Sequence, residues 1–318
     1  MYLQMYFSYH IFSVYLIAWG LLGNVGREDL IGPVDESAFR NLMVICLGIG
    51  FIASILYQTT VKVDTDESED GSEIVPEFSG TPTVLKWFKE YQMYQVAIVY
   101  MSTRLFVNLS QAYIPLYLQI TLKLPAKYVA TVPLTMFLSG FFTSLCMKKT
   151  NHLLGRKITY IIGASIGIAG CIWIRLGFND DENTKYYIFV VASILGIGGS
   201  CMLVTALALT AEFIGADTDA SAFIYGVMSL TDKVSNGLAV VLIQHFIPTK
   251  IDTCILCRQY FRDVILYCCG GAALLGIIGI ISLMKTTIGN RRVLANTTTT
   301  TTNLVINDDP DDERTPLI

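Results

Sequence analysis

The stretch YYIFVVASILGIGGSCMLVTALA, residues 186–208, decides the fold class of this chain. It contains no Asp, Glu, Lys or Arg, and it is long enough to cross a bilayer, since a helix needs roughly 20 apolar residues for this. In lipid, every backbone polar group must be satisfied within the spanning segment, which favours helices over open sheets. The apolar run is continuous instead of alternating, which argues against the strands of a β-barrel. The stretch therefore predicts a transmembrane helix.

Seven further segments share this apolar character. Together with the first stretch, the expected spans are residues 3–22, 40–60, 94–118, 128–147, 158–177, 186–208, 222–247 and 263–284. The composition agrees, because 53% of the 318 residues are apolar, only 15% are charged, and the mean hydropathy is +0.53. A soluble protein of this size needs more charge to cover its surface. We therefore expect an all-α membrane protein with about eight transmembrane helices.

The chain divides at an acidic linker that contains Pro and Gly, residues 62–93. Residues 1–61 hold the first two expected helices, and residues 94–285 hold a bundle of six. The linker and the tail, residues 286–318, are rich in charge or low in complexity, which predicts disorder. The net charge of −4 offers no basic field for a nucleic acid partner. The expected partners are membrane lipid and a small-molecule substrate.

Lys and Arg in the short loops predict the orientation of the helices. Basic residues occur in the linker, in residues 148–157 and directly after residue 284. All three segments fall on one side if every span crosses, and the positive-inside rule assigns that side to the cytosol. The acidic Glu212 falls on the same side, but acids contribute little to this rule.

Two of the expected spans carry charged side chains deep in the membrane, at Arg104 and at Asp232–Lys233. A charge at the bilayer centre costs roughly 3 kcal/mol on insertion scales, so such residues are usually functional or paired. Polar residues at helical spacing give each of these two spans one polar face. The candidate cavity residues on the two spans are Arg104, Asn108, Gln111, Tyr225, Ser229, Asp232, Lys233 and Asn236.

Two interpretations of these polar faces remain open, and both could hold. The faces could line a shared, water-filled cavity, or Arg104 and Asp232 could form a buried pair that locks the two helices together. Lys233 is expected to point about 100° away from Asp232, because successive residues of a helix are turned by that angle.

The segment YGVMSLTDKVSNG, residues 225–237, resembles the eleventh helix of the glycoside–pentoside–hexuronide cation symporters, a branch of the major facilitator superfamily. Lys233 matches the Lys of that helix. Residues 100–105 and 108–111 are similar to the seventh helix of the proteins in one animal group of the superfamily. The likeness covers nearly the whole chain and implies a fold of two six-helix bundles. The spans here would be helices 5–12, with the N-terminal bundle incomplete.

The resemblance also implies an activity. It implies secondary active transport by alternating access, with a substrate site between the bundles. The animal group implies import of cysteine into lysosomes and melanosomes, with a bearing on pigmentation. Such a substrate is a zwitterion, and the candidate cavity offers cations for its carboxylate and an acid for its amine. Whether a cation is transported together with the substrate stays an open question. Alternatives are a sugar or lysophospholipid symporter of the same fold, or a truncated, non-transporting membrane protein that pairs with a full-length transporter.

The loop between the expected spans at 128–147 and 158–177 resembles a signature of the superfamily. Gly155-Arg156-Lys157 matches its Gly-Arg-Lys, but His152 stands where an Asp is usual. The resemblance implies a conformational loop whose charge-pair latch is altered at His152. The cations could equally be ordinary positive-inside charge.

Two short motifs complete the sequence. Glu313, Leu317 and Ile318 resemble an acidic dileucine sorting signal, which an adaptor complex reads on cytosolic tails. Cys254 and Cys257 lie on the non-cytosolic side and could form a disulfide if that side is oxidising. No catalytic or cofactor motif is visible, and the histidines are scattered, so we expect no enzyme, cofactor or metal.

Overall fold

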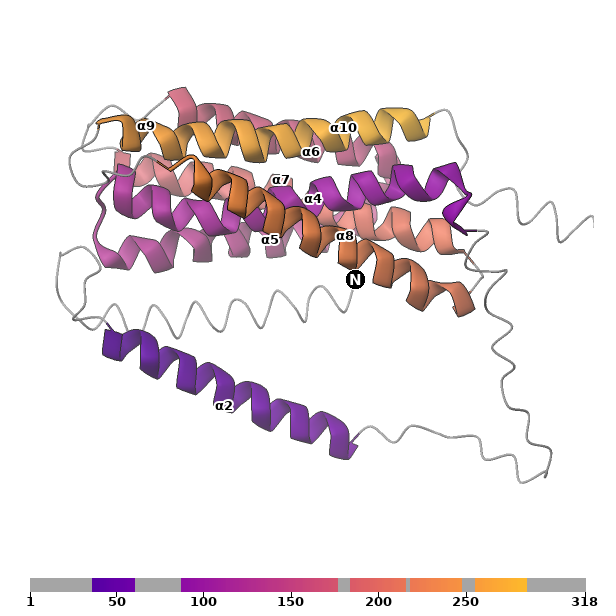
Figure 1. Ribbon diagram of the computed structural model, residues 1–318, viewed down its shortest axis with the longest axis horizontal. Coiled ribbons are helices and arrows are strands. Elements are labelled where there is room, and N and C mark those ends of the chain that lie inside the picture. The colour runs from indigo at the N-terminus through magenta and orange to yellow at the C-terminus, as the bar shows by residue number, and fades with distance from the viewer. Residues whose placement is uncertain (1–35, 61–86, 177–183, 216–217, 248–254, 285–318) are drawn as a thin grey trace, which may run out of the picture.

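The computed structural model describes residues 36–60, 87–176, 184–215, 218–247 and 255–284. Within these ranges every regular element is a helix (Figure 1). In chain order they are α2 (Glu36–Thr60), α4 (Tyr91–Leu116), η2 (Tyr117–Thr121), α5 (Ala126–Leu154), α6 (Arg156–Leu176), α7 (Thr184–Ile214), α8 (Thr218–His245), α9 (Ile255–Val264), η3 (Ile265–Gly270) and α10 (Gly271–Met284). The π-helical turns η2 and η3 extend α4 and join α9 to α10.

Six segments of these helices are long and apolar enough to cross a membrane. They are Phe39–Thr59, Lys127–Leu154, Arg156–Leu176, Tyr186–Ile214, Ser221–His245 and Gln259–Met284. The expected span at 94–118 overlaps α4, which is long enough to cross a membrane but is not among these six segments. The expectation of an all-α membrane fold is confirmed. The expected span at 3–22 lies outside the described residues, as does most of the linker at 62–93.

The structure shifts several boundaries outward from the expected ones. α4 begins at Tyr91 instead of residue 94, and α5 extends to Leu154 instead of residue 147. The last helix starts at Ile255, because α9 and η3 precede α10 without a break in helical backbone. Hydropathy located the apolar centres of these helices but not their polar ends, which carry charged residues beyond the bilayer core.

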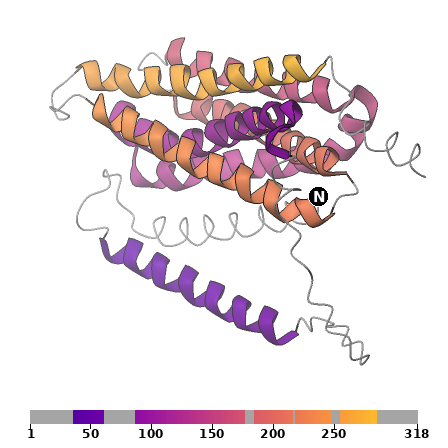
Figure 2. The same ribbon diagram turned by 45° about the vertical axis from the view of Figure 1, so that its right-hand side comes forward.

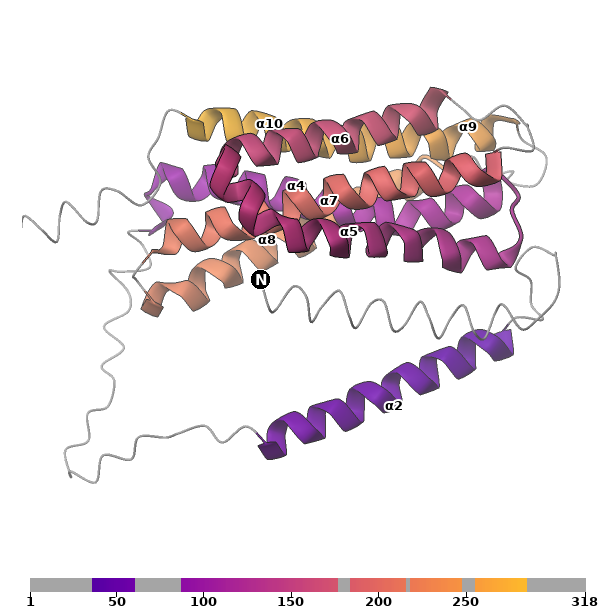
Figure 3. The same ribbon diagram turned by 180° about the vertical axis from the view of Figure 1, so that it is seen from behind.

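The helices from α4 to α10 form one bundle (Figure 1, Figure 2). α7 packs along α5 and α6, while α4 packs against α10, α7 and α8. Phe106 of α4, Tyr160 of α6 and Met202 of α7 are fully buried between them. α8 lies at the edge of the bundle and touches mainly α4. α2 lies apart from the bundle, as the view from behind also shows (Figure 3). The apolar side chains of α2 are exposed.

Glycines allow α6 and α7 to approach until their backbones touch. A Cβ atom added to Gly198 would lie 2.7 Å from the backbone nitrogen of Gly167 and 2.9 Å from the carbonyl oxygen of Gly163. Gly163 and Gly167 form a G-x-x-x-G, the spacing that brings membrane helices into close contact. Because the obstructing atoms belong to the backbone, this crossing has no room for a side chain.

We predict that Gly198→Ala destabilises the bundle by about 1–3 kcal/mol, the usual effect of overpacking a filled core. The measurement is the thermal unfolding midpoint of the detergent-purified protein. Gly271→Ala is the matched control, because a Cβ at Gly271 meets no atom within 4 Å. Equal midpoints for the two variants would contradict the close crossing of α6 and α7.

Candidate functional site

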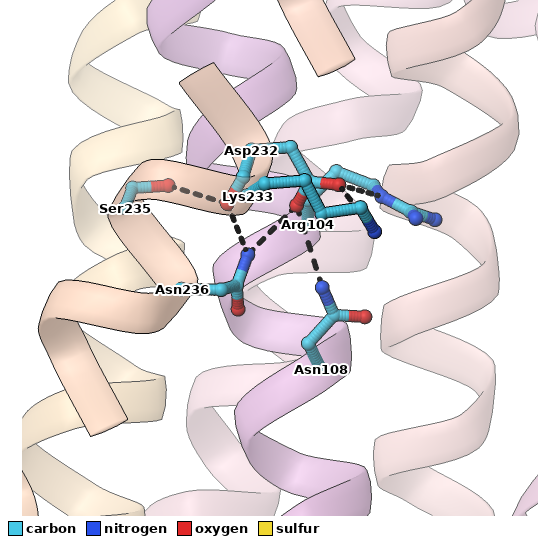
Figure 4. Close-up of polar contacts among 6 residues, drawn as sticks. All are labelled: Arg104, Asn108, Asp232, Lys233, Ser235 and Asn236. Carbon is cyan, nitrogen blue, oxygen red and sulfur yellow. Dashed lines mark hydrogen bonds and ion pairs between the residues drawn. The ribbon is translucent and has the colours of Figure 1, made fainter. Parts of the chain in front are cut away.

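The charged residues inside the membrane-spanning helices meet where α4 crosses α8 (Figure 4). Asp232 of α8 lies at the centre, with only 1% of its surface exposed. Arg104 donates from Nε to Asp232 Oδ2 at 3.3 Å, and Lys233 Nζ lies 3.6 Å from the same oxygen. Asn236 and Asn108 donate from Nδ2 to Asp232 Oδ1 at 2.7 and 3.4 Å. The carboxylate is therefore surrounded by two cations and two amides, which we call the Asp232 network.

Helical spacing explains how these groups converge. Arg104 and Asn108 are one turn apart on α4, so both face α8. Asn236 lies one turn after Asp232, and its Nδ2 also donates to the Asp232 backbone oxygen at 2.8 Å. Ser235 donates from Oγ to that same backbone oxygen at 3.0 Å. These two local bonds hold the side chains of the next helical turn beside Asp232.

The prediction that Lys233 points away from Asp232 is wrong for its ammonium group. The two residues do leave the helix in different directions, but the long, flexible lysine stem brings Nζ back toward the carboxylate. The Lys233 side chain nevertheless remains 71% exposed, whereas that of Arg104 is 23% exposed. Lys233 thus lies at the rim of the network, and Arg104 lies deeper.

The remaining candidate cavity residues lie around this centre. Tyr225 and Ser229 are exposed on α8, and Gln111 is half-buried on α4. Among the described residues, Gln111 and Ser229 form no hydrogen bond with the network. The two polar faces therefore meet, with direct contacts concentrated at Asp232.

Of the two interpretations that the sequence left open, the buried pair is present in the structure. The pair links α4 to α8, and the amides of Asn108 and Asn236 complete the solvation of the carboxylate. An isolated buried carboxylate is very unfavourable, but one that is paired and hydrogen-bonded can be retained. The shared cavity stays a prediction.

A second polar cluster lies at one end of the bundle, at the expected conformational loop. Gly155 ends α5 with φ +80°, a conformation in which a side chain would be strained. Immediately after it, Arg156 Nη1 donates to Glu212 Oε2 of α7 at 2.6 Å. Lys157 Nζ donates to the backbone oxygen of Leu283 in α10, also at 2.6 Å. The start of α6 is thereby tied to the ends of two other helices.

Sequence reasoning missed Glu212 as the partner of Arg156. The usable signal is the position of Glu212 near the end of a span, on the same side of the membrane as the loop that contains Arg156. His152, which replaces the usual Asp, is exposed. The role of His152, Gly155, Arg156 and Lys157 as a conformational loop stays a prediction.

Two predicted features cannot be placed in the fold. Cys254, Glu313, Leu317 and Ile318 lie outside the described residues, and the side chain of Cys257 is not described either. In the part of the chain that the structure describes, no group of three or more His, Cys, Asp or Glu side chains could hold a metal ion.

Comparison with known proteins identifies the family. A sequence model described as Major Facilitator Superfamily matches residues 9–240. The chain belongs to the major facilitator superfamily. It is similar to proteins named major facilitator superfamily domain-containing protein 12, with 38% identity for that of Mus musculus, 37% for Equus caballus and 35% for Homo sapiens. Each comparison covers 86% of this chain and 59–60% of the relative, so the chain spans about 60% of these curated relatives.

Membership of the superfamily gives the bundle a functional setting. The chain is a multi-pass membrane protein of a transporter superfamily. The Asp232 network then lies between two membrane-spanning helices, where charge is costly and is usually kept for a function.

We predict that Asp232→Ala destabilises the bundle by about 3–5 kcal/mol, because it leaves the partly buried Arg104 without the carboxylate that it pairs with. Asp263→Ala is the control. It removes the Arg175–Asp263 pair, whose atoms are 2.6 Å apart but whose side chains are 42% and 36% exposed, and such pairs contribute up to about 1 kcal/mol. Thermal midpoints of the purified variants provide the measurement.

A double substitution tests the pairing itself. Combining Arg104→Leu with Asp232→Leu removes both charges and should recover part of the stability lost with Asp232→Leu alone. If the losses of the two single variants simply add in the double variant, Arg104 and Asp232 are not energetically coupled.

Proposed function

We propose that this protein is a secondary transporter that moves cysteine, or a similar small thiol amino acid, into lysosomes and melanosomes by alternating access. The Asp232 network carries this proposal. It places an acid, two cations and two amides between α4 and α8, inside a bundle of a transporter superfamily.

The energetic cost of the network supports a transport role. Charged side chains in a membrane span are expensive, so they mark substrate or ion pathways more often than they serve packing. The structure offers a cheaper way to join helices in the same bundle, because α6 and α7 cross through the uncharged contacts of Gly163, Gly167 and Gly198. The charged pair that also joins these two helices, Arg156–Glu212, lies at the end of the bundle. A role in binding a polar solute therefore explains the charged network between α4 and α8 better than a role in holding the two helices together.

The identity with the curated relatives supports a shared activity. It reaches 35–38% over 86% of the chain. Transfer of the cysteine substrate and of the organelle rests on the family resemblance. In this proposal, the residues that line the substrate cavity are Arg104, Asn108, Gln111, Tyr225, Ser229, Asp232, Lys233 and Asn236.

The end cluster fits a role in alternating access. In alternating access the two bundles rock against each other. If this motion shifts the start of α6 relative to the end of α7, the Arg156–Glu212 bond has to break. Both side chains are 42% exposed, so water can replace their contact at low cost. Such a pair can open and close repeatedly, which suits a conformational latch.

The tail supplies the proposed route to the organelle. Glu313, Leu317 and Ile318 would be read by an adaptor complex that sorts membrane proteins to lysosomes and melanosomes. This part of the proposal rests on the sequence motif.

We predict that Lys233→Ala abolishes uptake of labelled cysteine into vesicles that contain the protein, while protein amount and location persist. Lys149→Ala is the matched control, because this exposed lysine lies near the end of α5. Unchanged uptake with Lys233→Ala would remove Lys233 from the site. If an unlabelled sugar or lysophospholipid inhibits uptake more strongly than unlabelled cysteine does, then that compound, and not cysteine, is the substrate.

A further inference from the structure

The acceptor capacity of Asp232 is already used within the protein. An ionised carboxylate accepts about four hydrogen bonds on its two oxygens. Here Arg104 and Lys233 approach Oδ2, and Asn108 and Asn236 donate to Oδ1. The carboxylate is also almost completely buried. An amine of a substrate could reach Asp232 only by displacing one of these four groups.

The two cations, in contrast, keep donors that are not used. Arg104 contacts Asp232 through Nε, and among the described residues its two terminal nitrogens take part in no hydrogen bond or ion pair. Figure 4 shows these terminal nitrogens pointing away from the carboxylate, on the same side as the Lys233 ammonium group. Lys233 carries three donors, and its exposed side chain can turn toward an incoming group.

The charge of the network adds a second argument. Arg104 and Lys233 contribute two positive charges and Asp232 one negative charge, so the network carries a net charge of +1. An excess charge among apolar helices is unfavourable unless a counter-ion compensates it. A singly charged oxyanion would balance it, and a carboxylate also fits the planar donor fork of Arg.

We infer that Arg104 and Lys233 form the binding site for the carboxylate of the transported molecule, and that Asp232 positions these two cations instead of binding the substrate amine. The inference rests on the proposed function and names the group of the substrate that this site reads. It replaces the expectation that the acid would bind the amine of a zwitterion. The substrate class is then small carboxylates, whether or not they carry an amine.

Four small molecules separate the carboxylate from the amine and from a lipid phosphate. L-cysteine carries both groups, 3-mercaptopropionate lacks the amine, cysteamine lacks the carboxylate, and glycerophosphocholine offers a phosphodiester. The shift of the thermal midpoint of the purified full chain with ligand concentration gives the affinity for each, without any need for transport. We expect 3-mercaptopropionate to bind about as well as cysteine, and cysteamine at least about tenfold more weakly.

Four variants test the roles of individual residues. Lys233→Ala should abolish the preference for 3-mercaptopropionate over cysteamine, Lys233→Arg should keep it, and Lys149→Ala should leave it unchanged. Asp232→Asn distinguishes a positioning residue from an amine ligand. If Asp232 positions the cations, the ratio of the cysteine and 3-mercaptopropionate affinities stays the same. If it binds the amine, cysteine alone loses affinity. If Asp232→Asn fails to fold, the affinities of the unmodified protein for the four small molecules still test the inference.

Three results would overturn the inference: cysteamine binding as tightly as cysteine, neither carboxylate compound binding, or glycerophosphocholine binding more tightly than both. Failure of the proposed function looks different. In that case vesicles show no cysteine uptake, while the purified protein still binds 3-mercaptopropionate in preference to cysteamine.

Discussion

The burial of one carboxylate between two membrane-spanning helices constrains the rest of this structure. Asp232 cannot face lipid and cannot remain without partners. Its position therefore requires α8 to turn this face toward a helix that supplies donors. α4 supplies them through Arg104 and Asn108, and the following turn of α8 adds Asn236. The crossing of α4 and α8 is thus fixed by electrostatics, whereas the crossing of α6 and α7 is fixed by glycine contacts.

The same constraint explains why α4, a long helix that is not among the six candidate membrane spans, lies inside the bundle. α4 carries polar groups on more than one face, so a lipid-facing position would expose them. On another side of α4, Thr103 Oγ1 lies 2.8 Å from the hydroxyl of Tyr160 in α6, and both residues are fully buried. Gln95 of α4 donates from Nε2 to Oγ of Ser282 in α10 at 3.0 Å. α4 therefore holds three neighbouring helices through polar contacts that lipid could not provide.

These contacts also show how far the sequence can be interpreted. The periodicity of polar residues predicted which faces of the two helices would meet, because helical spacing is regular. The periodicity gave the wrong position for the ammonium group of Lys233. The direction of Cβ does not determine where the end of a long, flexible side chain lies. The periodicity failed for Glu212 as well, because the pairing with Arg156 depends on the packing of α7 against α6, which no local pattern encodes. The fold class was therefore predictable, but long side chains and contacts between helices distant in sequence were not.

The exposure of the network is unequal, and this asymmetry bears on how a solute would approach it. Asp232 is buried against α4, while the Lys233 side chain is exposed on the face of α8 that no other described helix covers. A molecule arriving from that face meets positive charge before it can meet the acid. Members of this superfamily bind substrate between two bundles, so the open face of α8 would be the one turned toward the other bundle. The first electrostatic contact of the solute would then be with the cations, and the buried acid would act through them.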